Sequence, residues 1–287
     1  MTFVFSPVTS RLGARVTGRS IAAADDDDLA EIRAAVARHK VLFFADQHLE
    51  PEDHLAFARR MGEIDVAAFG PKHPDHPEMT VLDQTAPKGE GADAWHTDNT
   101  YVERPPSYTI LRSVLLPAIG GDTCFADMYA AWDALSPAMQ TMLSGLTATH
   151  DLTRTLTRAI ADGNSDADLG AMQAAYPPVH HPIARVHPDT GRLALFVNGN
   201  FTTRIDGLTE AESTALLSML LHHVGSPAFQ CRPRWAEGDL TIWDNRAVQH
   251  YAVPDYTTRR IMHRLTIAGE APQGPVGPDV SAAVAGV

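Results

Sequence analysis

The sequence predicts a mainly β fold with helical insertions, a barrel-like sandwich of short strands with helices packed outside it. Two observations predict this class. Short apolar segments of strand length recur along the chain and alternate with helical segments. Neither standard form of the glycine-rich phosphate loop, which would favour a doubly wound sheet, occurs in the sequence. With 287 residues, 44% of them hydrophobic, the chain can bury a substantial core, and we predict one domain over residues 1–270.

Four elements are predicted in the N-terminal part of the chain. Residues 13–16 have the pattern of a short strand. The acids at residues 25–28 suit the positive end of a helix that ends near residue 40. A cation-binding cluster is the alternative for these acids, and capping is preferred because charge runs are usually solvated. The apolar residues 41–44 form a buried strand, and residues 51–61 form a helix with proline at its first position.

The rest of the chain also alternates between strands and helices. Residues 151–176 are polar and are expected to form a mobile loop or irregular helices. Residues 271–287 form a Pro/Gly/Ala-rich tail that is mobile or lies across a surface. The expected strands are residues 109–116, 123–126, 193–198, 240–243 and 261–267. The expected helices are residues 129–146, divided by an N-cap at Ser136 and Pro137, and residues 209–223.

Composition limits the partners and the location of the protein. The formal net charge of -12 argues against nucleic acid and anionic membranes as partners. Cys124 and Cys231 are too few for a disulfide framework, and we expect two reduced thiols. The N-terminus lacks a signal-peptide pattern, and no uninterrupted apolar run could span a bilayer. We therefore expect a cytoplasmic protein, and a homo-oligomer, either a dimer or a tetramer.

One short motif, Trp95-His96-Thr97-Asp98, places two metal-type ligands one residue apart. If the motif lies on a strand, His96 and Asp98 point to the same face. A distant third ligand, His250, would complete a set that leaves three positions of an octahedron open. Two histidines and a carboxylate with open positions are typical of non-haem iron(II) oxygenases. The tripeptide alone is weak, because the chain contains 14 histidines.

The sequence after His250 strengthens this hypothesis. On the following strand, Arg260, Met262 and Arg264 would share one face. Two arginines that point into a barrel are costly unless anions meet them, so we predict anion binding. A pair of surface salt bridges is the alternative. Other histidines are interpreted as surface, core or structural residues: His54, His73, His180, His181, His187 and His222.

Several motifs, in order from about residue 10 to about residue 270, resemble the taurine dioxygenase family. This family also includes phenoxyalkanoate-herbicide dioxygenases and oxidative alkylsulfatases. The resembling stretches are residues 95–98, 120–123, 196–198, 201–205, 243–246, 249–251 and 259–264. The resemblance implies a double-stranded β-helix, or jelly-roll barrel, with helical insertions. It also implies iron(II) as the metal, with 2-oxoglutarate and O2 as cosubstrates.

The resemblance assigns a role to each site residue. His96, Asp98 and His250 would hold the iron. Arg260, helped by the hydroxyl of Thr123, would bind the distal carboxylate of 2-oxoglutarate, and a bidentate guanidinium suits a carboxylate in its geometry. The implied reaction releases succinate and CO2 while a small anionic substrate is hydroxylated next to a heteroatom.

The implied substrate is a sulfonate, a sulfate ester or an aryloxy acid. Its acidic group would face Arg264, Asn99 would border the pocket, and Phe201 would form an apolar wall. Taurine-specific members carry polar residues where this chain has Ala67, Gly70, Gly91 and Ala92. The pocket should therefore be less polar than theirs, unless Lys72 or His73 substitutes, and taurine itself is the alternative substrate.

Two functions of other classes use the same residues. A zinc hydrolase would need an open water position and a general base, but it would have no use for Arg260. A non-catalytic barrel is the other possibility, and decayed ligands would indicate it. The ligand residues of this chain are all intact.

Overall fold

The computed structural model describes residues 2–66, 70–85, 94–161, 163 and 165–275. The expected strand at residues 13–16 is Ala14–Thr17, and the expected helix at residues 51–61 has those bounds. Four sheets organise the described chain, and nearly all neighbouring strands are antiparallel, which confirms that the fold is not doubly wound. Strands far apart in sequence lie side by side in them, so the chain closes on itself through long-range pairing.

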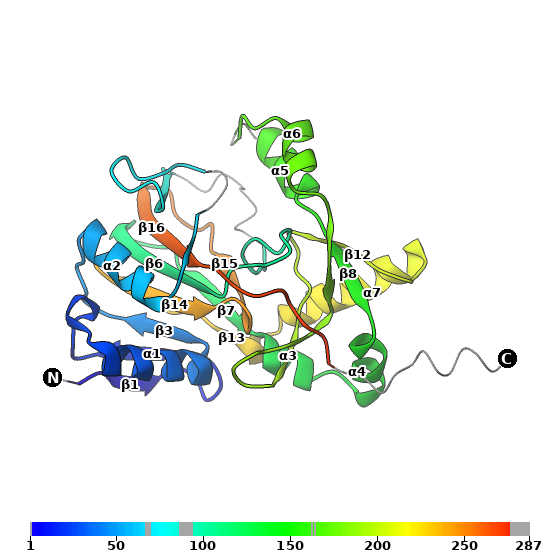
Figure 1. Cartoon of the computed structure of the whole chain (residues 1–287), viewed down its shortest axis with the longest axis horizontal. Helices are drawn as coiled ribbons and strands as arrows, with labels where there is room; N and C mark the ends of the chain where they lie inside the picture. Colours follow the sequence, from blue (N-terminus) through cyan, green and yellow to red (C-terminus); the bar gives the residue numbers. More distant parts are fainter. Residues whose placement is uncertain (1, 67–69, 86–93, 162, 164, 276–287) are drawn as a thin grey trace.

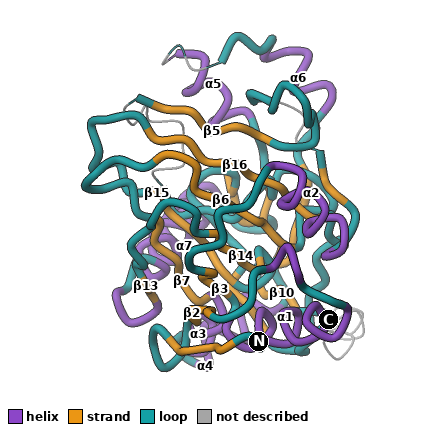
Figure 2. Tube along the Cα trace, turned by 90° about the vertical axis from the view of Figure 1, so that its left-hand side faces the viewer, coloured by secondary structure: helices purple, strands orange, loops and turns teal. Residues whose placement is uncertain are grey.

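The largest sheet has eight strands in the order β1-β2-β3-β14-β6-β16-β4, and β5 also pairs with β16. Figure 2 shows β5, β16 and β6 as neighbours. The strands are β1 (Val4–Pro7), β2 (Ala14–Thr17), β3 (Val41–Phe44), β4 (Ile64–Asp65), β5 (Thr80–Gln84), β6 (Tyr108–Leu115), β14 (Leu240–Asp244) and β16 (Arg260–Ile267).

Three smaller sheets complete the β structure. One has the order β13-β7-β15, a second has the order β12-β8-β9, and a third pairs β10 with β11. Their strands are β7 (Thr123–Asp127), β8 (Thr147–His150), β9 (Val179–Pro182), β10 (Ala184–Val186), β11 (Leu193–Leu195), β12 (Thr202–Ile205), β13 (Gln230–Cys231) and β15 (Val248–Ala252). The strand expected over residues 193–198 is therefore shorter, because the chain leaves β11 for a turn.

The helices begin where the sequence provides caps. The Asp25 side chain accepts from the Asp28 N–H in a capping box, which confirms the capping role of the acidic run. Thr209 caps its helix in the same way, and the Ser136 side chain accepts from the Met139 N–H without a capping box. The helices are α1 (Asp26–His39), α2 (Pro51–Met61), α3 (Met128–Asp133), α4 (Pro137–Ser144), α5 (Thr153–Ala161), α6 (Leu169–Ala175) and α7 (Glu210–Val224), with short 3₁₀ helices η1 (Ile21–Ala23) and η2 (Pro227–Phe229).

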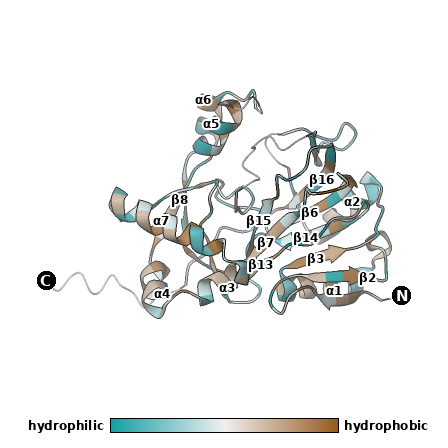
Figure 3. Ribbon diagram, turned by 180° about the vertical axis from the view of Figure 1, so that it is seen from behind, coloured by the Kyte–Doolittle hydropathy of each residue, from teal (hydrophilic) through white to brown (hydrophobic). Residues whose placement is uncertain are grey.

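The two faces of the large sheet bury different cores. Leu42, Ile110 and Leu265 point to the face that α1 and α2 cover. On the other face, Trp243 and Met262 pack against Phe125 of the small sheet β13-β7-β15. The hydrophobic colouring of β3 in Figure 3 fits a strand buried on both sides. The two sheets therefore face each other across a shared core, as expected of a sandwich.

The segment 151–176 forms helices rather than one loop. Figure 1 shows α5 and α6 together at one edge of the molecule. Part of the tail lies across a surface, because the Val186 N–H donates to the Gln273 carbonyl at 2.7 Å. Cys124 and Cys231 are buried free thiols, as expected. Among the described residues, no helix has the length and apolarity needed to cross a bilayer.

Candidate metal and anion site

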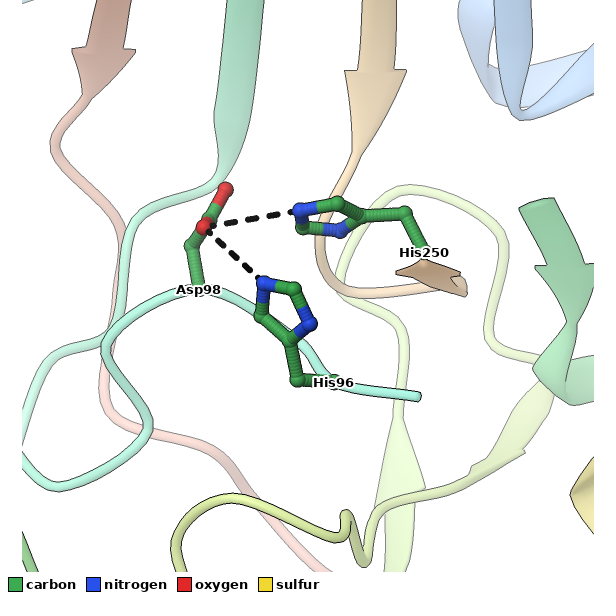
Figure 4. A group of neighbouring side chains, drawn as sticks. All are labelled: His96, Asp98 and His250. Atoms are coloured by element: carbon green, nitrogen blue, oxygen red, sulfur yellow. Dashed lines mark ion pairs between the residues drawn. The ribbon is translucent and has the colours of Figure 1, made fainter. Parts of the chain in front are cut away.

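Three candidate ligands converge in Figure 4. His96 and Asp98 come from the segment before β6, and His250 comes from β15. The Nε2 atoms of His96 and His250 lie 4.0 and 3.7 Å from Oδ1 of Asp98. Ligands bound at about 2.1 Å to one ion are at most about 4.2 Å apart, so these distances fit one metal ion. All three residues are buried, as in a site built to exclude water.

The expectation that His-x-Asp lies on a strand is wrong. Only His96 makes a β-bridge, to His250, and Asp98 lies in the turn that follows. The bridge hydrogen bonds join the backbones of the two histidines at 3.0 and 2.8 Å, and this pairing brings the distant ligand into place. Asn99 has a φ of 49°, and this left-handed residue turns the chain after Asp98.

Hydrogen bonds orient two of the ligands. Nδ1 of His96 donates to the Ala94 carbonyl at 2.8 Å, so Nε2 carries the ring lone pair that can bind a metal. Oδ2 of Asp98 accepts from the Thr109 hydroxyl at 2.6 Å, which leaves Oδ1 for the metal.

A relay of hydrogen bonds supports Thr109 from behind. The Trp243 indole N–H donates to the side-chain Oδ1 of Asn245 at 3.0 Å. The side-chain Nδ2 of Asn245 donates to the Thr109 hydroxyl at 2.8 Å. Thr109 and Asn245 had no predicted role, although Asn245 lies in one of the stretches that resemble the family. Outer partners of this kind usually fix ligand orientation.

The site favours the protonation states that a metal needs. Burial lowers the pKa of His250 to about 3, so its imidazole is neutral. Burial alone would raise the pKa of Asp98, but His250, Arg264, His96 and the Thr109 hydroxyl lower it to about 2. The carboxylate is therefore ionised and both imidazoles can offer a lone pair.

Arg260 is a buried cation on β16, four residues before Arg264. Its side chain is 5% exposed, and its Nε has no hydrogen-bond acceptor among the described residues. Burial lowers the pKa of this guanidinium. Gly121 makes the space, because a Cβ there would lie 3.1 Å from Cδ of Arg260 and the glycine has a φ of +74°. The burial of Arg260 contradicts the surface salt-bridge alternative for this residue, and its unbonded Nε can donate to an anion.

Thr123, at the start of β7, is 2% exposed and lies two residues after Gly121, the glycine that makes space for Arg260. Its hydroxyl accepts from the Trp235 indole N–H at 3.2 Å. Because the indole can only donate, the hydroxyl proton remains available for an acceptor such as a carboxylate. Trp235 is a positioning residue that the sequence did not indicate.

Arg264 points to the metal ligands, as the alternation on β16 predicted. Its Nη1 lies 3.6 Å from Oδ1 of Asp98, and its side chain is 24% exposed. The two arginines differ in this respect, because Arg260 is enclosed and Arg264 can meet a ligand that enters from solvent.

Phe201 belongs to a small apolar cluster that joins the site to α5 and α6. Its ring lies 5.1 Å from that of Tyr101, and both pack with Leu152 and Leu156 of the helical segment. Tyr101 also lies within electrostatic reach of Arg264 and Asp98. Phe201 therefore packs on a residue that lies near the ligands, and its role as an apolar wall of the substrate pocket stays a prediction. The sequence did not indicate Tyr101.

The other histidines are mostly structural, as expected. His187 pairs with Asp244 at 2.9 Å, and His181 donates to the Thr100 carbonyl. His54 is a core residue, but it is not a satisfied one, because neither ring nitrogen meets an acceptor or donor among the described residues. Three residues of the expected taurine difference, Ala67, Gly91 and Ala92, lie outside the described residues.

Comparisons with known proteins agree over most of the chain. Residues 5–266 match the family described as taurine catabolism dioxygenase TauD, TfdA family. An alpha-ketoglutarate-dependent sulfate ester dioxygenase from Pseudomonas putida is 39% identical, with 94% of this chain and 91% of the relative covered.

Two further proteins extend the range of similar activities. A (S)-phenoxypropionate/alpha-ketoglutarate-dioxygenase from Sphingobium herbicidovorans is 34% identical, with 93% of this chain and 96% of the relative covered. The crystal structure of a taurine dioxygenase from Burkholderia xenovorans superposes with a TM-score of 0.82 at 32% identity, covering 97% of this chain and 95% of that one.

Proposed function

The chain belongs to the TauD, TfdA family of dioxygenases, and from this premise we propose that His96, Asp98 and His250 bind iron(II) and that Arg260 and Thr123 bind 2-oxoglutarate. The protein is an oxidoreductase, a 2-oxoglutarate-dependent dioxygenase that uses O2 and acts on a small anionic substrate. Succinate and CO2 are the products of the cosubstrate.

One observation carries the assignment of the site. A buried guanidinium with an unbonded Nε, as judged over the described residues, lies on β16 four residues before Arg264, whose Nη1 is 3.6 Å from Oδ1 of the ligand Asp98. A dicarboxylate that chelates the metal through one end can place its other carboxylate against Arg260 and Thr123. A zinc hydrolase would need the three ligands but not this cation, and the relatives named above are dioxygenases.

The residues of the chain provide orientation and protection from water. Iron(II), with 2-oxoglutarate and O2, supplies the oxidising power to convert a substrate C–H bond into C–OH. His96 and Asp98 keep fixed directions through Ala94 and Thr109. Arg264 holds the substrate anion beside Asp98, so that the carbon next to the acidic group or its oxygen faces the metal.

The substrate we propose is an alkyl or aryl sulfonate, a sulfate ester or an aryloxy acid. Arg264 supplies the cation, Asn99 borders the pocket, and Phe201 with Tyr101 supplies an apolar wall. Hydroxylation next to the heteroatom gives a product that collapses to an aldehyde or ketone and releases the anion or phenol. Taurine, which would release sulfite and aminoacetaldehyde, is the alternative.

We further propose the setting in which this enzyme works. Residues 1–270 form one domain whose facing sheets close as a jelly-roll barrel. Residues 276–287 of the expected tail lie outside the described residues. The helices α5 and α6 act as a closing lid, since their cluster reaches Phe201 and Tyr101. The protein is cytoplasmic and assembles as a dimer or tetramer.

The test measures succinate formed from 2-oxoglutarate by the iron-loaded protein across sulfonates, sulfate esters and aryloxy acids. His96→Ala should abolish turnover and metal binding while the fold, followed by circular dichroism, is kept. Unchanged turnover in this variant would overturn the metal assignment. Clearly best turnover of taurine would overturn the substrate class in favour of the alternative.

A further inference from the structure

A hairpin next to the substrate pocket carries the only lysine that the structure places on the face of the metal ligands among the described residues. The Val81 N–H donates to the Pro71 carbonyl and the His73 N–H donates to the Met79 carbonyl, both at 2.9 Å. These bonds flank the bridge between Lys72 and Thr80, which is therefore a close, non-hydrogen-bonded pair.

The sheet register extends this pair to the substrate arginine. Thr80 is directly opposite Arg264 on β16, and β5 lies beside β16 in Figure 2. Residues that are opposite each other on neighbouring strands point to the same face. Lys72, Thr80 and Arg264 therefore form one row across the sheet, and all three side chains project to the face of Asp98.

The neighbours of this row confirm which face it occupies. Leu82, two residues after Thr80, packs into the core between the two sheets. His73, one residue after Lys72, turns to the opposite face, where its ring lies 5.3 Å from His263. Lys72 and not His73 therefore shares the pocket with Arg264.

The row of Lys72, Thr80 and Arg264 leaves space for an anion between its two long cationic side chains. Adjacent strands are about 4.8 Å apart, so the backbones of Lys72 and Arg264 are separated by about 10 Å. Thr80 between them is short and buried, whereas Lys72 and Arg264 are long and partly accessible. Their two charged groups can therefore converge above Thr80.

Charge also favours an anion at this place. Asp65 lies within electrostatic reach of both Lys72 and Arg264, and Asp98 lies 3.6 Å from Arg264. Because Asp98 is assigned to the metal, Asp65 is the carboxylate that remains to the two cations. Burial lowers the pKa of Lys72, and the neighbouring Arg264 lowers it further. An added anion would relieve the repulsion between the two cations.

We propose that Lys72 is the second cation of the substrate site and that Lys72 and Arg264 together select sulfonates and sulfate esters over carboxylates. The proposal rests on the proposed function, because it concerns the substrate of the same site. A guanidinium alone matches the two oxygens of a planar carboxylate. A second cation that approaches from another direction can contact the third oxygen, which only the tetrahedral head group has.

The experiment compares head groups on one alkyl chain. Hexyl sulfate, hexanesulfonate and hexanoate are titrated calorimetrically, without oxygen, into protein loaded with iron(II) and 2-oxoglutarate. Lys72→Met should weaken binding of the sulfate and the sulfonate by about tenfold or more, which is about 1.4 kcal/mol. Binding of hexanoate should change by less than about twofold, and Lys72→Arg should retain most of the preference.

A matched control removes a cation of α2 that pairs with the same hairpin outside the pocket. Arg59 of α2 is exposed and pairs with Glu78, so Arg59→Met changes the net charge by the same amount outside the pocket. It should leave all three affinities unchanged. Equal losses for sulfate and hexanoate in Lys72→Met, or no loss for either, would overturn the proposal. In those cases 2-oxoglutarate consumption would continue, whereas failure of the proposed function would abolish it in the wild type as well.

Discussion

Two buried polar regions flank Asn245, and they differ in whether their polar atoms all have hydrogen-bond partners within the protein. In the first, which we call the Asp244 cluster, the residues are His187, Asp244, Arg246 and Tyr108. Both oxygens of Asp244 accept hydrogen bonds, and Arg246 donates to Asp244 and to Tyr108. The second region is the metal and anion site, where Arg260 Nε and His250 Nδ1 have no partner among the described residues.

This difference in hydrogen bonding distinguishes polar residues that stabilise the fold from polar residues that bind a ligand. A closed network leaves nothing for a small molecule to bind, and its loss exposes an unpaired charge in the core. A region with unpaired polar atoms lowers the stability of the ligand-free protein, and a ligand that pairs with these atoms stabilises the folded state. Three substitutions and one change of pH test this contrast, and each separates stability from ligand affinity.

Arg246→Met should have the largest effect, on stability. Asp244 would remain as a buried charge without its Arg246 partner, so the free energy of unfolding should fall by about 3–5 kcal/mol. Denaturant unfolding of the metal-free protein measures this loss. Arg192→Met, which removes an exposed arginine paired with Asp133, should change it by less than about 0.5 kcal/mol. If Arg246→Met kept full stability but bound 2-oxoglutarate more weakly, the Asp244 cluster would be a ligand site and not a structural one.

Arg260→Met should instead act on the ligand. Its affinity for 2-oxoglutarate should fall by about 100-fold, or about 3 kcal/mol, because the distal carboxylate loses its buried cation. The unfolding free energy without ligand should stay the same or rise, since an incompletely bonded guanidinium is removed. Calorimetry and denaturant unfolding measure the two quantities. Arg259→Met, which changes the exposed neighbour paired with Asp83, is the control.

Low pH should lower the stability that the Asp244 cluster gives to the protein, and it should do so over a defined pH range. Burial alone would raise the pKa of Asp244, but hydrogen bonds from His187 and Arg246 lower it from 3.8 to about 2. A lowered folded-state pKa stabilises the protein above the unfolded value, and this contribution of about 2 kcal/mol is lost as pH falls from about 4 to about 2. Unfolding measured across this range should be steeper in the wild type than in Asp244→Asn. Parallel curves would exclude the linkage.

Trp235→Phe should have the smallest effect. The variant keeps the ring but loses the donor to Thr123, so the hydroxyl is no longer held for the carboxylate. The KM for 2-oxoglutarate should rise about fivefold, or about 1 kcal/mol, as for one hydrogen bond. The KM for the primary substrate serves as the internal control. An equal rise in both constants would indicate a general packing defect.

Local signals explain which parts of this fold could be predicted from the sequence. Helix starts follow from a capping side chain three residues before its partner, so the acidic run at residues 25–28 and Ser136 marked their helices correctly. The period-two alternation of side chains along β16 likewise predicted correctly that Arg264 lies toward Asp98. These features depend on neighbours in the chain.

The features that the sequence did not indicate depend on distant pairing. Asp98 lies in a turn, and a backbone bridge from His96 to His250, rather than a strand, brings the ligands together. The Thr109 hydroxyl matters only because β14 and β6 lie side by side and Asn245 reaches it. The row from Lys72 to Arg264 requires the register of three strands, which residue spacing does not contain.

The relay that begins at Trp243 gives the molecule an optical reporter. The Trp243 ring centroid lies 4.7 Å from that of His250, and its indole N–H is joined to Asp98 through Asn245 and Thr109. An open-shell ion bound between these residues should quench the emission of this indole strongly. Fluorescence titration with cobalt(II) should therefore follow loading in real time, and the quenching should be largely absent in Trp243→Phe.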